Sequence, residues 1–186
     1  TVARLAVEET GLGVYEDKVL KHQKKTIGVL RDLQGEKTVG VIERVPEKGL
    51  VKIAKPMGVI GAITPMTNSS STMPCNGLMI LKARNAVIFA PHPRAKKTCA
   101  VTCEEMRKGL AKVGAPLDLV QYIEEPSIEL TQELMSKVDL VLATGGAGVV
   151  KPAYSSGKPA YGVGAGNATV VVDETADLPV TAAKIC

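Results

Sequence analysis

Short apolar segments alternate with helix-type segments along most of this chain, and this alternation restricts the fold more than any other feature. Four of the segments, each of four or five residues, are almost continuously apolar. A strand with that pattern is buried on both faces, as in a parallel sheet that helices cover on each side. The helix-type segments supply the crossovers that parallel strands need. We therefore predict an α/β fold whose parallel sheet contains residues 59–63, 86–90, 119–123 and 140–143.

The remaining segments predict helices between these strands and a different architecture near the start of the chain. Residues 1–10 and 16–33 carry apolar side chains at helical spacing, which predicts an N-terminal helical pair. Residues 37–42 and 50–54 are rich in β-formers around the turn sequence PEKG, which predicts a hairpin-like arm. The helices expected between the strands are residues 73–83, 95–113 and 128–136.

Polar loops follow the four predicted strands. Their sequences are TPMTN at 64–68, PHPR at 91–94, EEPS at 124–127 and TGGAG at 144–148. Ligands of open parallel sheets bind outside the carboxyl ends of the strands, and these ends meet at one edge. We therefore expect the four loops to form one site.

Two glycine clusters lie near the last predicted strand. Gly145, Gly146 and Gly148 follow it directly, and a GVGAGN sequence at 162–167 precedes a further expected strand at 168–172. Glycines at a strand-to-helix turn let backbone N–H groups approach a ligand, but they also suit ordinary tight turns. Neither cluster has the spacing of the dinucleotide fingerprint, so a nucleotide site here must be of another type.

Asn68 and His92 are the side chains in these loops with the clearest chemical capacity. The Asn68 amide could donate a hydrogen bond to a developing oxyanion, although a polar turn that caps the next helix explains the same sequence. His92 lies between two prolines, which indicates a rigid turn. We favour contact with a cofactor over proton transfer for His92.

Composition restricts the class of partner. The net charge is +4, but the chain has only four Tyr, one Phe and no Trp, so the stacking platforms of a single-strand nucleic-acid binder are scarce. No apolar run reaches the length of a membrane span, and we expect neither nucleic acid nor membrane as a partner. The four cysteines lack CxxC spacing and only two histidines exist, which predicts no metal site and reduced thiols.

Five segments of the chain resemble the CoA-acylating aldehyde dehydrogenases. They are EETGLGVYEDKV at 8–19, RNAVIFAPHPRAK at 84–96, ATGGAG at 143–148, AYSSGKPA at 153–160 and GVGAGN at 162–167. The likeness extends to the aldehyde dehydrogenase half of bifunctional aldehyde/alcohol dehydrogenases and to CoA-dependent succinate-semialdehyde dehydrogenases. It covers essentially the whole chain.

This resemblance implies an aldehyde-dehydrogenase-type Rossmann-like domain and an oxidoreductase. In the family a cysteine thiolate attacks an aldehyde, hydride passes to NAD or NADP, and coenzyme A takes the acyl group from the thioester. Asn68 is then the oxyanion donor, and Gly162 stands where hydrolytic relatives carry a general-base glutamate. The implied cofactor-binding residues are Thr64, Pro65 and Thr67 near the nicotinamide, Pro91, His92 and Pro93 beside the adenosine, Gly145 and Gly146 at the pyrophosphate, and Gly164.

The resemblance also implies an organisation for the chain. Residues 1–36 form an N-terminal helical part, 37–55 a β-arm of the oligomerisation type, and 56–186 an incomplete cofactor-binding domain. The nucleophile is expected beyond Cys186, so the chain is interpreted as a fragment that is inactive alone. We expect a cytoplasmic homo-oligomer, with a bacterial microcompartment as the alternative location and a filament-forming parent as one possibility.

Four points stay open on sequence. Ser69 stands where the family usually has proline, which puts the local loop shape in question. A non-catalytic assembly module, or a nucleotide-binding regulatory domain of the same origin, would fit the same sequence. The identity of the aldehyde and the choice between NAD and NADP are not determined.

Overall fold

The computed structural model describes residues 1–166 and 169–185 and contains a five-stranded sheet in the order β5-β4-β3-β6-β7, with every pairing parallel. All four strands predicted from sequence share this sheet, so the α/β prediction is confirmed. Only β5 is clearly shorter than expected, because a 3-10 turn occupies Leu117–Leu119. The strands are β3 (Val59–Thr64), β4 (Ala86–Pro91), β5 (Val120–Tyr122), β6 (Leu140–Thr144) and β7 (Ala160–Val163).

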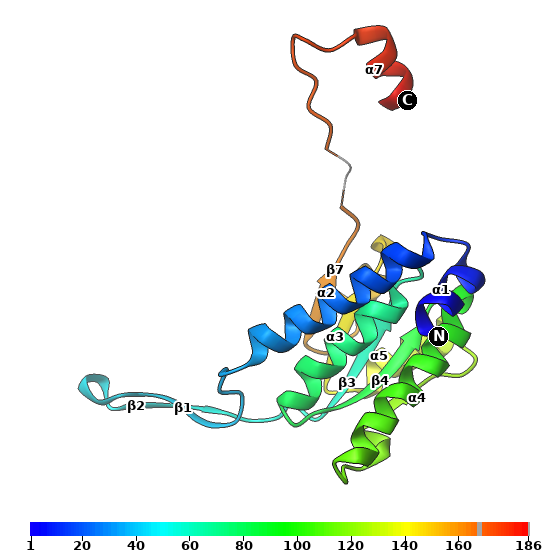
Figure 1. The fold of residues 1–186 in the computed structure, drawn as a ribbon. Coiled ribbons are helices and arrows are strands. Elements are labelled where there is room, and N and C mark those ends of the chain that lie inside the picture. Colours follow the sequence, from blue (N-terminus) through cyan, green and yellow to red (C-terminus); the bar gives the residue numbers. More distant parts are fainter. Residues whose placement is uncertain (167–168, 186) are drawn as a thin grey trace.

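Helices cover both faces of the sheet, as Figure 1 shows. One face packs on α3 (Ser69–Lys82) and α4 (Lys96–Lys112), through a core that includes Phe89 and Met73. The other face packs on α5 (Ile128–Lys137) and α6 (Ala147–Tyr154), through a second core that includes Ala90 and Met135. Phe89 and Ala90 are neighbours in β4 but belong to opposite cores, because successive strand side chains point to opposite faces.

Two N-terminal helices lie over the α3 and α4 layer (Figure 1). They are α1 (Val2–Thr10) and α2 (Tyr15–Leu33), close to the predicted bounds. The Glu9 carboxylate at the end of α1 accepts hydrogen bonds from the backbone N–H groups of Lys97 (2.8 Å) and Thr98 (2.7 Å). A carboxylate at a helix N-terminus satisfies unpaired N–H groups and complements the helix dipole. Glu9 therefore joins α1 to the first turn of α4.

The predicted arm is an antiparallel hairpin that projects from the α/β body (Figure 1). It consists of β1 (Gly40–Val45) and β2 (Leu50–Ala54), joined by a 3-10 turn at Pro46–Lys48. Gly49 ends that turn with φ 61°, a left-handed conformation that favours glycine. Apolar side chains of the arm, such as Leu50 and Ile53, are exposed.

The end of the chain differs from the prediction. The strand β7 was not expected, whereas residues 169–172 of the strand expected at 168–172 have no strand conformation, and Ala168 lies outside the described residues. That prediction was wrong because a run of valines predicts a buried strand, whereas Val171 is 88% exposed. The last helix, α7 (Leu178–Ile185), lies away from the sheet (Figure 1). Among the described helices, none is long and apolar enough to cross a membrane.

Candidate functional site

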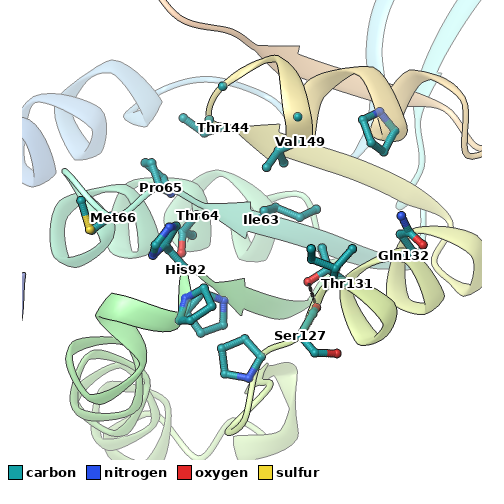
Figure 2. A pocket seen from close by; sticks show the side chains of 18 of the residues that line it. Ile63, Thr64, Pro65, Met66, His92, Ser127, Thr131, Gln132, Thr144 and Val149 are labelled. Atoms are coloured by element: carbon teal, nitrogen blue, oxygen red, sulfur yellow. Dashed lines mark hydrogen bonds between the residues drawn. The ribbon is translucent and has the colours of Figure 1, made fainter.

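A cavity of about 430 Å³ lies at the carboxyl ends of the central strands (Figure 2). Residues from all four predicted loops line it: those after β3, β4 and β6, and the one that leads into α5. The position agrees with the rule that ligands of parallel sheets bind beyond the strand ends. The prediction that the four loops meet at one site is therefore confirmed in its geometry.

Seven of the ten residues that the sequence suggested for the site line this cavity. Thr67, Asn68 and Gly164 do not line it; Thr67 and Gly164 are exposed, and Asn68 is half-buried at the start of α3. The seven lining residues are Thr64, Pro65, Pro91, His92, Pro93, Gly145 and Gly146.

The wall opposite the prolines comes from α5 and α6 and was missed by the sequence analysis. Thr131 and Gln132 of α5 and Val149 of α6 face the cavity, as Figure 2 shows. The Thr131 hydroxyl donates to the Ser127 backbone oxygen at 2.7 Å, which holds it against the helix start. Helical periodicity identified α5 but could not say which of its polar residues border a cavity. A mostly apolar pocket with a few polar groups is typical of cofactor sites.

Thr64 borders the cavity, and its buried hydroxyl is an unpaired polar atom. Its side chain is 2% exposed, and its Oγ1 finds no hydrogen-bond partner among the residues that the structure describes. Leaving a buried hydroxyl unpaired costs free energy, so such groups are expected to bond a ligand or water. Thr64 therefore fits a site whose occupant brings a polar atom to the end of β3.

The turn between β6 and α6 leaves open space at its glycines. A Cβ atom added at Gly146 or Gly148 would meet nothing within 4 Å. Gly146 caps α6 with φ −75° and ψ 178°, an extended conformation that any residue adopts. A side chain at Gly146 would therefore not strain the backbone of the turn. The glycine keeps the helix N-terminus accessible, which suits an anionic group.

Gly162 in β7 is the opposite case. A Cβ atom there would lie 2.6 Å from Val150 Cγ1 and 2.8 Å from Tyr154 Cε2. The Gly162 N–H also donates to the Tyr154 hydroxyl at 3.0 Å. The ring of Tyr154 thus takes the place that a side chain at this position would need.

His92 is held as a turn residue. Its Nδ1 accepts a hydrogen bond from the Arg94 backbone N–H at 3.1 Å, and its side chain is exposed at the cavity edge. The neighbouring cations have other partners: Arg94 donates to the Thr10 carbonyl at 3.4 Å, and Lys96 pairs with Glu125 at 2.6 Å. These bonds support a positioning role for the PHPR turn.

Asn68 begins α3, but its side chain does not cap the helix. Its Oδ1 instead accepts a hydrogen bond from Lys21 Nζ of α2. One residue further along α2 and two further along α3, His22 Nε2 and Ser70 Oγ lie 2.8 Å apart. Sequence analysis missed Lys21 and His22, because nothing in their local pattern distinguishes them from the solvated face of an amphipathic helix.

The described cysteines are poor candidates for a nucleophile. Cys99 and Cys103 are fully buried, and the hydrogen bond to Cys103, followed by burial, raises the pKa of Cys99 far above its usual range. Burial also raises the pKa of Cys75. Cys186 lies outside the described residues. Since the thiolate is the reactive form, these surroundings favour inert thiols.

The fold and the cavity together define a parallel α/β domain with a cofactor-type site at its strand ends. The sequence profile of the aldehyde dehydrogenase family matches residues 9–186, and the chain belongs to that family.

Relatives with the same fold carry more specific names. The chain is 56% identical over 184 residues to a sulfoacetaldehyde dehydrogenase of an Acholeplasma species. It is 53% identical over 175 residues to a succinate-semialdehyde dehydrogenase (acetylating) of Clostridium kluyveri. These matches cover 99% and 94% of this chain but only 38% and 39% of the two relatives. The chain thus spans well under half the length of the curated relatives it matches.

Solved structures agree with this likeness. An acetylating aldehyde dehydrogenase of Geobacillus thermoglucosidasius aligns with a TM-score of 0.86 and 46% identity, over 89% of this chain and 37% of that one. An engineered glycolyl-CoA reductase with bound NADP+ aligns with a TM-score of 0.74 and 42% identity, over 99% of this chain and 42% of that one. A Rhodopseudomonas palustris propionaldehyde dehydrogenase with bound CoA and an acylated cysteine aligns with a TM-score of 0.74 and 43% identity, over 99% of this chain and 42% of that one.

Proposed function

We propose that the chain is the nucleotide-side part of an enzyme that converts an aldehyde, CoA and NAD(P)+ to acyl-CoA, NAD(P)H and a proton. The observation that carries the proposal is the cavity at the ends of β3, β4 and β6, in a chain that belongs to the aldehyde dehydrogenase family. Relatives named as acetylating, and others solved with NADP+ or CoA, support this choice of substrates.

The lining residues fit a nicotinamide dinucleotide. The open turn at Gly145 and Gly146 receives the pyrophosphate at the N-terminus of α6. The unpaired Thr64 hydroxyl, together with Pro65 and Thr67, lies on the nicotinamide side, and Pro91, His92 and Pro93 lie beside the adenosine. Gly164 is proposed as a further backbone contact. The bound nucleotide accepts hydride; these residues only hold it and exclude water.

Asn68 is proposed to stabilise the oxyanion that forms when a thiolate attacks the aldehyde, and that thiolate is supplied outside this chain. The Tyr154 ring beside Gly162 leaves no room for a carboxylate that could activate water. Release of the acyl group to the CoA thiol, rather than to water, follows from that arrangement.

We propose the same division of the chain as the resemblance implies: a helical part at 1–36, an assembly arm at 37–55 and the cofactor domain from 56 onward. Exposed Ile42, Leu50, Val51 and Ile53 on the arm support homo-oligomeric assembly, since apolar side chains on a projecting hairpin suit burial against another subunit. We further propose that the full-length protein assembles into filaments. Its proposed location is the cytoplasm or the inside of a microcompartment.

The deciding experiment is an assay of the full-length protein that carries this chain. Acetaldehyde, succinate semialdehyde and sulfoacetaldehyde are each offered with NAD+ or NADP+, with and without CoA. We expect nucleotide reduction that requires CoA, and an acyl-CoA product by mass spectrometry. Equal rates without CoA, with free acid as the product, would contradict the proposal, and light scattering of the same sample tests the assembly.

A further inference from the structure

One cationic side chain of α2, Lys21, contacts the start of α3, and the charge of a second, Lys18, acts on it. Lys21 Nζ donates a hydrogen bond to Asn68 Oδ1. Lys18, almost one turn earlier, is only 7% exposed, and burial, followed by the charge of Lys21, lowers its pKa. Within residues 1–166 and 169–185 neither lysine forms an ion pair with a carboxylate. Positive charge at this place is therefore not neutralised by a neighbouring acid.

The Asn68 side chain has a defined orientation because of Lys21. An ammonium group can only donate hydrogen bonds, so the amide atom it contacts must be the oxygen, and the N–H₂ group must point the other way. The Asn68 carbonyl is fixed as well, since it accepts from the N–H groups of Ser71 (3.1 Å) and Thr72 (2.8 Å). Across the described residues the Asn68 N–H₂ group makes no hydrogen bond, so this donor is left to bind something else.

The contact between Lys21 and Asn68 is also supported by its surroundings. Figure 1 shows α2 running along α3, and the His22–Ser70 contact of 2.8 Å joins the same two helices next to the Lys21–Asn68 pair. Lys21 is half-buried, so its stem is supported by packing rather than free in solvent. A side chain held in this way can orient its partner without an entropy cost at each turnover.

We propose that Lys21 is a positioning residue, which aims the Asn68 amide N–H₂ at the developing oxyanion and strengthens it as a donor. This inference rests on the oxyanion role given to Asn68 above. A charge-assisted bond to the amide oxygen polarises the amide, and polarised hydrogen bonds in a chain reinforce one another. The ammonium charge, close behind the amide, also lowers the energy of negative charge on the far side.

The test is a set of variants in the full-length protein. Lys21→Met keeps the length of the stem and removes the charge and the donor. We expect kcat to fall about 10–100-fold, as when an outer hydrogen-bond partner of an active-site group is removed, while the Kd for NADH and the melting temperature stay close to wild type. Lys21→Arg retains a donor and should recover most of the lost rate. Lys24→Met, on the exposed side of α2, is the matched control and should leave kcat unchanged.

A double-mutant cycle gives the decisive result. Asn68→Ala should lower kcat about 10²–10³-fold, and adding Lys21→Met to it should cost little more, because the lysine acts through the amide. If Asn68→Ala lowers kcat but Lys21→Met does not, or if the two losses multiply, the inference is overturned while the proposed reaction stands. A wild-type protein without CoA-dependent turnover would instead remove the proposed function, and a raised NADH Kd in Lys21→Met would identify a structural role.

Discussion

At the scale of single residues, Gly146 and Thr64 have features that suit ligand binding and do not contribute to the stability of the fold. Gly146 has an ordinary extended backbone and open space around it, whereas Thr64 is buried with an unpaired hydroxyl. Neither feature stabilises the folded chain. Both are understandable if a ligand completes the site, and each leads to a prediction in which stability and affinity respond differently.

Gly146→Val should weaken nucleotide binding by about tenfold or more, because the new side chain would occupy space at the helix N-terminus where the pyrophosphate is proposed to lie. The melting temperature should change little, within the cost of about 1 kcal/mol for a poorer helix cap. Nucleotide titration and thermal melts measure the two effects. Gly109→Ala, in an exposed part of α4 with no atom near its Cβ, is the control for folding. Parallel loss of stability and binding would make Gly146 a purely structural residue.

Thr64→Val should have effects of opposite sign on stability and binding. The change removes a buried hydroxyl that has no partner, so the free energy of unfolding should stay equal or rise by about 1 kcal/mol. Nucleotide affinity should fall if the hydroxyl bonds the ligand. Thr102→Val is the matched comparison, because the buried Thr102 hydroxyl donates to the Thr98 carbonyl at 2.6 Å. It should lower stability and leave affinity unchanged; the same response in both variants would argue against a ligand contact at Thr64.

At the scale of elements, the contact between α2 and α3 is the most informative, because it includes two pairs of polar side chains. Lys21 and Asn68 form one pair across it, and His22 and Ser70 form the other. Burial, followed by the charges of Lys18, Lys21 and the N-terminal amino group, lowers the pKa of His22. The neutral imidazole is therefore the form that this helix contact stabilises.

His22 should titrate below the value of about 6.5 that an unperturbed histidine has. As the pH falls below about 6.5, the unfolded state binds a proton at His22 that the folded state does not yet bind. The stability that the neutral imidazole contributes is therefore fully present above the unfolded pKa and is lost as the pH falls through the folded pKa. NMR titration of the imidazole signals measures this. The chain has only two histidines, and His22→Gln identifies the signal. An imidazole pKa at or above the unperturbed value would contradict the proposed burial.

At the scale of the whole molecule, no cysteine among the described residues lines the cofactor-type cavity. Cys99 and Cys103 are buried in the core on the α3 and α4 side, and Cys75 does not line the cavity. The last described segment, residues 169–185, is almost wholly exposed and contributes nothing to the cavity wall. The sulfoacetaldehyde and succinate-semialdehyde dehydrogenases that the chain matches are more than twice as long.

The 186-residue chain alone should therefore show no CoA-dependent aldehyde oxidation, because the reaction needs a positioned thiolate. Weak nucleotide binding should survive, since the strand-end loops are present but lack any wall that further protein would supply. The assay uses purified chain with acetaldehyde, CoA and NAD+. Sustained turnover that Cys75→Ser or Cys186→Ser abolishes would show that the nucleophile lies within this chain. Turnover insensitive to both changes would indicate contaminating full-length enzyme.

Local sequence patterns determined the central strands, most helices and the four loops at the strand ends, because apolar periodicity and turn residues act over a few positions. Long-range packing decided the rest. The strand β7 carries a glycine and exposed side chains at a sheet edge, so no apolar run marks it, and the valines at 170–172 are solvent-exposed. Thr131 faces the cavity because α5 packs beside strand-end loops that are distant in sequence. Lys21 reaches Asn68 because α2 packs on α3. Such contacts join residues that share no local pattern, so only the tertiary structure could reveal them.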